Sequence, residues 1–175
     1  MPRPMDLSSI IRSRRSVRAF TKEPVPEPLL RELVELANWA PSAGNLQSRD
    51  FILVRDTEIR RALARAANQV ELAQAAAVLV VCANQNRVTK YGARGRELFA
   101  IQDAAAATQT FLLAAHERGL GAVWMGSFDE DAVRKILGVP RHARPVSLVA
   151  LGWPAENPEP PERLPLRDIL HSERW

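Results

Sequence analysis

The segment from Ala76 to Ala83 is a continuous run of apolar residues, and it restricts the possible fold more than any other feature of the chain. Its short length and its β-branched residues, among them Val78 and Val80, favour a buried strand over a helix. Cys82 lies inside the run and is expected to be an ordinary buried thiol. Such a strand has to be covered by other elements of the fold.

The longest helical pattern runs from Glu97 to Arg118 and contains four consecutive alanines, Ala104 to Ala107. Small residues on several faces let neighbouring helices approach closely, so we expect this helix at the centre of the fold or of a dimer. Gly119 and Gly121 follow it and are suited to end it.

Other patterns predict shorter elements on both sides of this helix. Asp6 is a plausible N-cap for a short opening helix. Apolar residues recur at helical spacing from Glu27 to Trp39. The remaining predicted helices cover 58–67 and 129–137, and the remaining strands cover 51–54, 122–125 and 146–151.

The order of these elements indicates the fold class. Strands and helices mix without strict alternation, which favours an α+β fold over a doubly wound α/β sheet. A length of 175 residues fits a single domain spanning 1–175. Residues 84–96 are polar and aperiodic, so we expect an irregular, mobile segment. The proline-rich tail, 154–175, ends in apolar residues that need a surface to lie on.

Composition excludes some classes of protein and leaves others open. One cysteine rules out an intramolecular disulfide framework. No stretch approaches the roughly 18 consecutive apolar residues of a membrane span, and the N-terminus lacks a signal-peptide core, so we expect a cytoplasmic protein. The net charge of +4, with arginine dominant, suits nucleic acid, an anionic membrane or a phosphate-bearing ligand.

Four segments carry residues suited to bind a ligand. Arg14, Ser16 and Arg18 can hold a phosphate bidentately, although a solvated basic face is the simpler interpretation. The loop from Pro41 to Gln47 offers small and amide side chains, or merely ends a helix. Gly126 and Ser127 lie between a strand and a helix, where free backbone N–H groups are common. Arg163, held between prolines, can bind phosphate or simply aid solubility.

These segments resemble, in order, the signatures of the flavin-dependent nitroreductase family. The matching stretches are Arg14–Phe20, Ala40–Gln47, Gln102–Ala107 and Gly119–Trp124, and the tail from Arg163 to Trp175 resembles the usual family ending. Together they span almost the whole chain. The resemblance implies an antiparallel-rich α+β fold and a homodimer with two flavin mononucleotide (FMN) sites at its interface. The tail would then reach across the partner.

The resemblance also implies roles for individual residues, all as cofactor contacts. Phosphate and ribityl contacts match Arg14 and Ser16, with Arg15 beside them, and a tail phosphate ligand matches Arg163. Arg18 matches the basic residue near N1 and O2 of the ring. The loop covering the flavin from the other subunit matches Pro41, Ser42, Ala43 and Asn45, with Gln47 nearby. The segment near N5 matches Met125, Gly126 and Ser127.

The implied activity is transfer of reducing equivalents from NADH or NADPH, through FMN, to a small organic acceptor such as a nitroaromatic or quinone. The flavin carries the chemistry, so no catalytic side chain is expected. Dehalogenation, flavin breakdown, activated-alkene reduction and a non-catalytic flavin-binding module stay open as alternatives.

Other assignments are less favoured. His116, His142 and His171 are far apart and show no metal-ligand spacing, so no metal is expected. A nucleic-acid interface built on Arg60, Arg61 and Arg65 lacks interleaved aromatic residues, so neither a nucleic-acid nor a membrane partner is expected. The sequence departs from the family at Ser48 and Arg49, where many members have proline and an aromatic residue.

Overall fold

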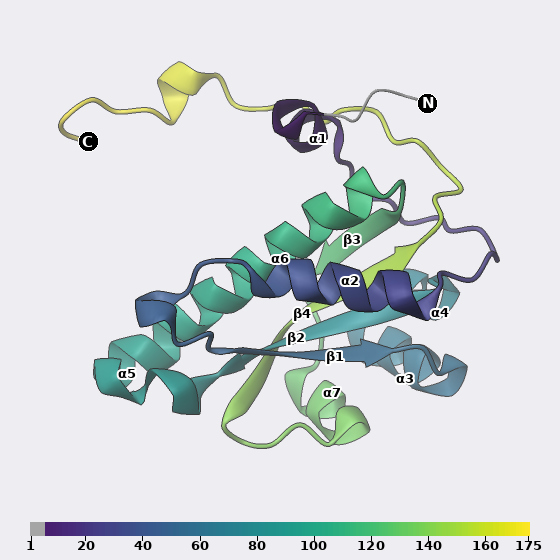
Figure 1. The fold of residues 1–175 in the computed structure, drawn as a ribbon, viewed down its shortest axis with the longest axis horizontal. Coiled ribbons are helices and arrows are strands. Elements are labelled where there is room, and N and C mark those ends of the chain that lie inside the picture. The colour runs from purple at the N-terminus through teal and green to yellow at the C-terminus, as the bar shows by residue number, and fades with distance from the viewer. Residues whose placement is uncertain (1–5) are drawn as a thin grey trace.

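The computed structural model describes residues 6–175 and contains a four-stranded antiparallel sheet with helices on both faces (Figure 1). The sheet order is β1-β2-β4-β3, and each neighbouring pair is antiparallel. The strands are β1 Arg49–Val54, β2 Ala77–Asn84, β3 Gly121–Met125 and β4 Ala143–Gly152. The α+β prediction is therefore confirmed.

Strand β2 is buried along its whole length because it is covered on both faces. Leu79 and Val81 pack in the cluster formed with α2 and α6, whereas Val78 and Val80 pack in the cluster formed with α3 and α7. Alternate side chains of a strand point to opposite faces. Two-sided burial therefore explains why the apolar run is continuous rather than alternating.

Most predicted helices are present close to their expected limits. Asp6 and Asp129 accept hydrogen bonds from backbone N–H groups three residues on, as N-caps do. The α-helices are α1 Leu7–Ser13, α2 Glu27–Asn38, α3 Thr57–Ala67, α4 Glu71–Gln74, α5 Gly92–Arg94, α6 Ala100–Glu117 and α7 Glu130–Leu137. Single turns of 3₁₀-helix cover Ala43–Asn45 and Leu166–Asp168.

The prediction of an irregular segment over 84–96 is wrong. After β2 the chain forms a 3₁₀ segment at Gln85–Tyr91, then α5, then a π-helical turn at Gly95–Phe99. Val88 is fully buried, and a Cβ at Gly95 would lie only 2.4 Å from the Val88 carbonyl oxygen. The sequence gives no periodic signal here because three kinds of helical turn, with different repeats, follow one another within fifteen residues.

Helix α6 is the central helix of the fold, packing against α1, α2 and all four strands. It lies within the one described helical stretch, Gln85–Glu117, that is long and apolar enough to cross a membrane by length and composition. Phe111 and Ala115 are fully buried between α2 and the sheet. Packing inside the fold accounts for its apolar character.

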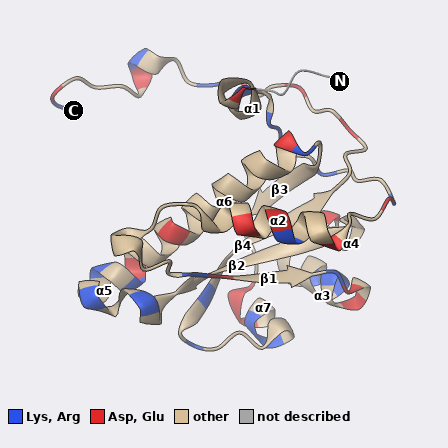
Figure 2. Ribbon diagram, in the orientation of Figure 1, with Lys and Arg blue, Asp and Glu red and all other residues tan. Residues whose placement is uncertain are grey.

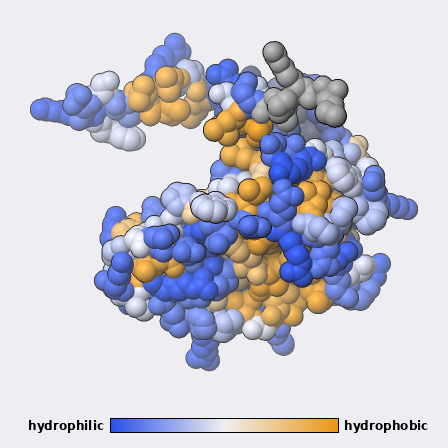
Figure 3. All heavy atoms as spheres, viewed as in Figure 1, coloured by the Kyte–Doolittle hydropathy of each residue, from blue (hydrophilic) through white to orange (hydrophobic). Residues whose placement is uncertain are grey.

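The tail leaves the sheet after β4 and runs past α1, away from the body of the molecule (Figure 1). Figure 3 shows hydrophobic atoms along this projecting segment. Leu164, Leu166 and Leu170 keep 69%, 66% and 61% of their surface exposed. Residues 6–175 leave them uncovered, so this part of the chain does not supply the expected supporting surface.

Gly121 is required at the start of β3 because a side chain there would collide with Val17. An added Cβ would lie 2.7 Å from Val17 Cγ1 and 3.2 Å from Pro154 Cβ. Gly121→Ala should therefore destabilise the protein by about 1 to 3 kcal/mol through overpacking.

Urea unfolding would measure the free energy of unfolding. Gly126→Ala is the matched control, because an added Cβ there meets no atom within 4 Å and its effect should be small. Equal stability of the two variants would contradict the close approach of Val17 to the strand.

Candidate functional site

The N-terminal arginine segment, residues 14–18, is attached to the edge strand β3 of the sheet. Ser16 forms an isolated parallel bridge with Ala122, and the Val17 N–H donates to the Ala122 carbonyl at 3.0 Å. Val17 is buried, and its side chain fits the space that Gly121 leaves. Residues 14–18 therefore run beside β3, with Arg14 and Arg15 half-buried and Arg18 exposed. Figure 2 shows the basic positions of this segment where the chain leaves α1.

A pocket of about 350 Å³ lies between this segment and the tail. It brings together all the phosphate-binding candidates, which come from two ends of the chain. The lining residues are Arg14, Arg15, Ser16, Arg18, Pro158, Glu159, Pro161 and Arg163. Four arginines face one carboxylate, so the pocket carries excess positive charge suited to a phosphate group.

The charge of this pocket is poorly neutralised. Burial lowers the pKa of Arg14, and repulsion from Arg163 and then Arg15 lowers it further. Among the residues that the structure describes, Arg14 makes no ion pair. A bound dianion would relieve this repulsion, so the residues present fit the phosphate of a mononucleotide.

Hydrogen bonds hold the two walls of the pocket together. Glu156 in the tail accepts from the backbone N–H groups of Arg18 at 2.5 Å and Ala19 at 3.1 Å. These bonds lower the pKa of Glu156 and keep it ionised. The Ala155 N–H in turn donates to the Ala19 carbonyl at 2.9 Å. The start of the tail is therefore fixed even though its end projects freely.

The segment Met125–Ser127 begins at the last residue of β3, three residues after Ala122, which pairs with Ser16. At the rise of a strand this is about 10 Å from the arginine segment. Met125 is buried, whereas Gly126 and Ser127 are exposed. One face of the molecule can thus present the basic pocket and this strand end to the same elongated ligand.

The loop Pro41–Gln47 lies elsewhere. Its Ala43 N–H donates to Asp103 in the first turn of α6, at 2.9 Å. The other end of α6 contacts the arginine segment, where His116 Nε2 lies 2.7 Å from Ser13 Oγ. Thirteen helical residues separate Asp103 from His116, or about 20 Å. A single chain therefore keeps this part of the predicted site apart from the basic pocket.

His116 is a neighbour of the basic pocket that sequence reasoning did not identify. Burial lowers its pKa, and the charges of Arg14 and Arg15 lower it further. Ser13 Oγ donates to the Ser9 carbonyl at 2.7 Å, so the hydroxyl is left to accept from a neutral His116. Ser13 and His116 meet only because α1 and α6 each turn that side chain towards the other helix. The sequence carries no signal of this contact.

The described residues contain no group of three His, Cys, Asp or Glu side chains placed to hold a metal ion. Cys82 is buried, and desolvation raises its pKa to about 11. A thiol in this state is a poor nucleophile. The candidate site is therefore a binding surface of cations and backbone groups rather than a nucleophilic centre.

Fold and site together describe a class: an α+β protein with a basic pocket, suited to a phosphate group, beside the edge strand β3 of its sheet. The family model described as "Nitroreductase family" matches residues 11–71 and 66–153. The chain belongs to the nitroreductase family.

Several named relatives cover nearly the whole chain. It is 39% identical to an NADH dehydrogenase of Thermus thermophilus, over 95% of each chain. It is 33% identical to the oxygen-insensitive NADPH nitroreductase of Salmonella typhimurium, over 92% of this chain and 71% of the relative. The solved NADPH:FMN oxidoreductase of Vibrio harveyi, complexed with NAD+, superposes with a TM-score of 0.86 at 30% identity, covering 95% of this chain and 76% of that one.

The lowered pKa of His116 predicts how stability depends on pH. Below its ordinary pKa of 6.5, the unfolded chain binds a proton that the folded protein resists. The stabilisation is therefore complete above that value and is lost as the pH falls towards the folded pKa. Urea midpoints measured from about pH 8 to about pH 5 should decrease less in His116→Gln than in the parent protein. If the urea midpoints of the two proteins fall in parallel with pH, the pKa of His116 is the same in the folded and unfolded chain, against the prediction.

Proposed function

We propose that the protein is an FMN-dependent oxidoreductase that passes reducing equivalents from NADH or NADPH to a small organic acceptor, such as a nitroaromatic or quinone. The observation that carries the proposal is the basic pocket beside β3, with four arginines and a single carboxylate, in a chain of this family. The Vibrio harveyi relative, whose name includes FMN, supports the choice of flavin. A cytoplasmic location is part of the proposal.

In this proposal the cofactor is held by residues of two copies of the chain. Arg14, Arg15, Ser16 and Arg163 would bind the phosphate and the chain attached to it. Arg18 would place positive charge near the N1 and O2 edge, and Met125, Gly126 and Ser127 would present backbone groups near N5. The loop residues Pro41, Ser42, Ala43, Asn45 and Gln47 would cover the ring from the partner.

Flavin supplies the redox chemistry when bound, because its ring can accept and donate a hydride. The protein's own residues bind the flavin, orient its ring and set the electrostatic potential around it. A fixed cation such as Arg18 favours negative charge developing on a neighbouring ring. No side chain is required as a nucleophile or as a general base, which fits the inert state of Cys82.

A homodimer is part of the proposal for two reasons. The loop Pro41–Gln47 is anchored about one length of α6 from the basic pocket, so only a second copy can bring it to the flavin. The tail also exposes Leu164, Leu166 and Leu170, which a partner's surface would cover.

The alternatives are weaker for different reasons. Dehalogenation, flavin breakdown and alkene reduction would use the same site, and turnover assays with each acceptor separate them. A nucleic-acid interface on α3 is disfavoured because Arg60 donates to the carbonyls of Ala73 and Ala75, and Arg61 pairs with Glu58 at 2.6 Å. Those guanidinium groups already have partners within the fold.

An absorbance spectrum of the purified protein tests the central claim. The desalted protein should show flavin bands, or acquire them with added FMN, and the bands should bleach when NADH or NADPH is added without oxygen. Bleaching followed by recovery with menadione or nitrofurazone would establish turnover. A protein that takes up no FMN would overturn the proposal, and uptake without bleaching would favour a non-catalytic flavin module.

Arg14→Ala should weaken FMN binding by about 1.5 to 3 kcal/mol, because it removes charge-assisted hydrogen bonds to the phosphate. Arg12→Ala is the matched control: Arg12 belongs to the same basic segment but is exposed and does not line the pocket. Titration of each apoprotein with FMN, followed by fluorescence, gives the two affinities. Equal affinities would remove Arg14 from the cofactor site.

Deleting residues 164–175 should weaken the dimer and flavin binding together, since it removes the exposed apolar tail but keeps Arg163. Sedimentation velocity would measure the dimer, and the absorbance ratio of flavin to protein would measure retention of the cofactor. A truncated protein that remains a flavin-loaded dimer would show that the tail is dispensable.

A further inference from the structure

The loop Pro41–Gln47 has a backbone that does not hold its shape unaided. Gly44, Asn45 and Gln47 all lie in the left-handed region, with φ of 57°, 55° and 50°. Two of the three are not glycine, and such conformations persist only where the surroundings determine them. Besides Lys90 and Tyr91, which lie against Gly44, a buried carboxylate and two arginines surround this loop.

Asp103 anchors the loop from α6. Its Oδ1 accepts from the Ala43 N–H at 2.9 Å, and its Oδ2 accepts from Ser48 N at 3.3 Å and from Ser48 Oγ at 2.5 Å. Asp103 is 5% exposed and Ser48 is fully buried. One carboxylate thus joins the beginning and the end of the loop, in an environment where such bonds are strong.

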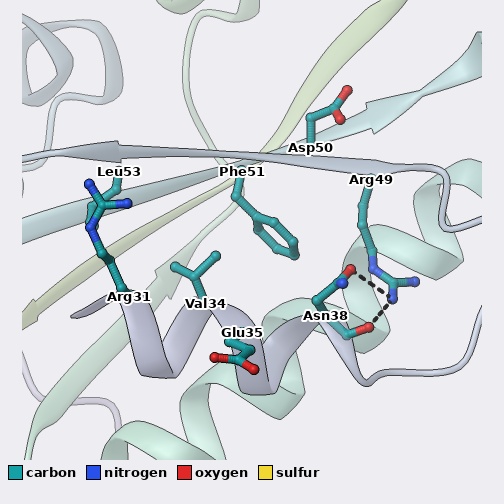
Figure 4. Close-up of a pocket in the computed structure, with 8 residues that line it drawn as sticks. All are labelled: Arg31, Val34, Glu35, Asn38, Arg49, Asp50, Phe51 and Leu53. Carbon is teal, nitrogen blue, oxygen red and sulfur yellow. Dashed lines mark hydrogen bonds between the residues drawn. The ribbon is translucent and has the colours of Figure 1, made fainter. Parts of the chain in front are cut away.

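Arg49 fixes the entrance of the loop from the other side. Its Nη2 donates to the carbonyl oxygen of Asn38 at 2.6 Å and lies 3.4 Å from the Asn38 Oδ1 (Figure 4). It also donates to the Ala40 carbonyl at 2.9 Å, and both carbonyls are free because α2 ends there. Arg49 is only 2% exposed. It runs from the first residue of β1 to the end of α2 and lines a pocket of about 530 Å³ between the two.

Arg87 completes the set at the exit of the loop. Its Nη1 donates to the carbonyls of Gln47 and Arg49, both at 2.8 Å, and its Nη2 pairs with Asp50 at 2.5 Å. Within residues 41–47, every group bound by Asp103, Arg49 and Arg87 belongs to the backbone. The side chains of Asn45 and Gln47 are exposed and lie outside this set of bonds. Gln47 Nε2 donates to the Asn45 carbonyl at 3.3 Å, which leaves its amide oxygen and the whole Asn45 amide to face a ligand.

We propose that Ser48, Arg49 and Asp103 are positioning residues that hold the Pro41–Gln47 loop in its left-handed conformation, so that its amide side chains meet the flavin bound by a second copy of the chain. This inference rests on the proposed function. It also gives a role to Ser48 and Arg49, the two positions where the sequence departs from the common family pattern. Hydrogen bonds from both residues hold the loop at its stem.

The test compares Ser48→Ala with Thr108→Val. Thr108 is also fully buried on α6, and its hydroxyl donates to the Ala104 carbonyl at 2.8 Å, away from the loop. Both variants remove a buried hydroxyl group together with its hydrogen bonding, which for Thr108 includes a 3.4 Å contact with Ser147 Oγ, so both should lower the melting temperature. Only Ser48→Ala should raise the dissociation constant for FMN, by about three- to tenfold, and shift the midpoint potential of the bound flavin.

Asp103→Asn is the second variant, because it replaces one acceptor oxygen with an amide donor, and its effect on FMN affinity should exceed that of Ser48→Ala. If Ser48→Ala and Asp103→Asn match Thr108→Val in affinity and potential, Ser48 and Asp103 are merely structural and the inference is wrong. Failure of the parent protein to bind FMN would overturn the proposed function and, with it, this inference. A parent protein that binds FMN, with variants that match the control, would overturn this inference alone.

Discussion

The two-sided burial of β2 is the constraint on which the rest of the structure depends. A strand with apolar side chains on both faces needs a helical layer on each side, and α2 and α6 supply one while α3 and α7 supply the other. With β2 and β4 in the middle of the sheet, β1 and β3 become its edges. The arginine segment lies along one edge, and the pocket under α2 lies along the other.

Three features of the single chain each suggest a dimer that shares a cofactor, for different physical reasons. The basic pocket has excess positive charge, the tail exposes apolar side chains, and the loop Pro41–Gln47 presents exposed amides far from that pocket. Like charges held together without counterions and apolar surface in water each cost free energy in isolation. A dimer that shares a phosphate-bearing cofactor would reduce both costs and would bring the loop to the ligand, which is why the proposed function includes a dimer.

The regular elements were predictable because their signals are local. Helical spacing identified α2 and α6, capping aspartates marked the starts of α1 and α7, and the apolar run located β2. The segment after β2 was not predictable, because 3₁₀, α and π turns follow one another without a common period. The arginine cluster was visible in the sequence, but its position in one pocket with Arg163 was not. That position depends on hydrogen bonds between the tail and residues 18–19.

The sequence by itself determined the class of fold, the family and the residue types available for a cofactor, since periodicity, caps and ordered motifs are properties of neighbouring residues. Tertiary structure alone decided which of these residues meet. It placed Ser16 beside β3, set His116 against Ser13, buried Asp103 under the loop and kept that loop about 20 Å from the arginines. The physical reason is that long-range contacts arise from packing around a shared core, which no local pattern encodes.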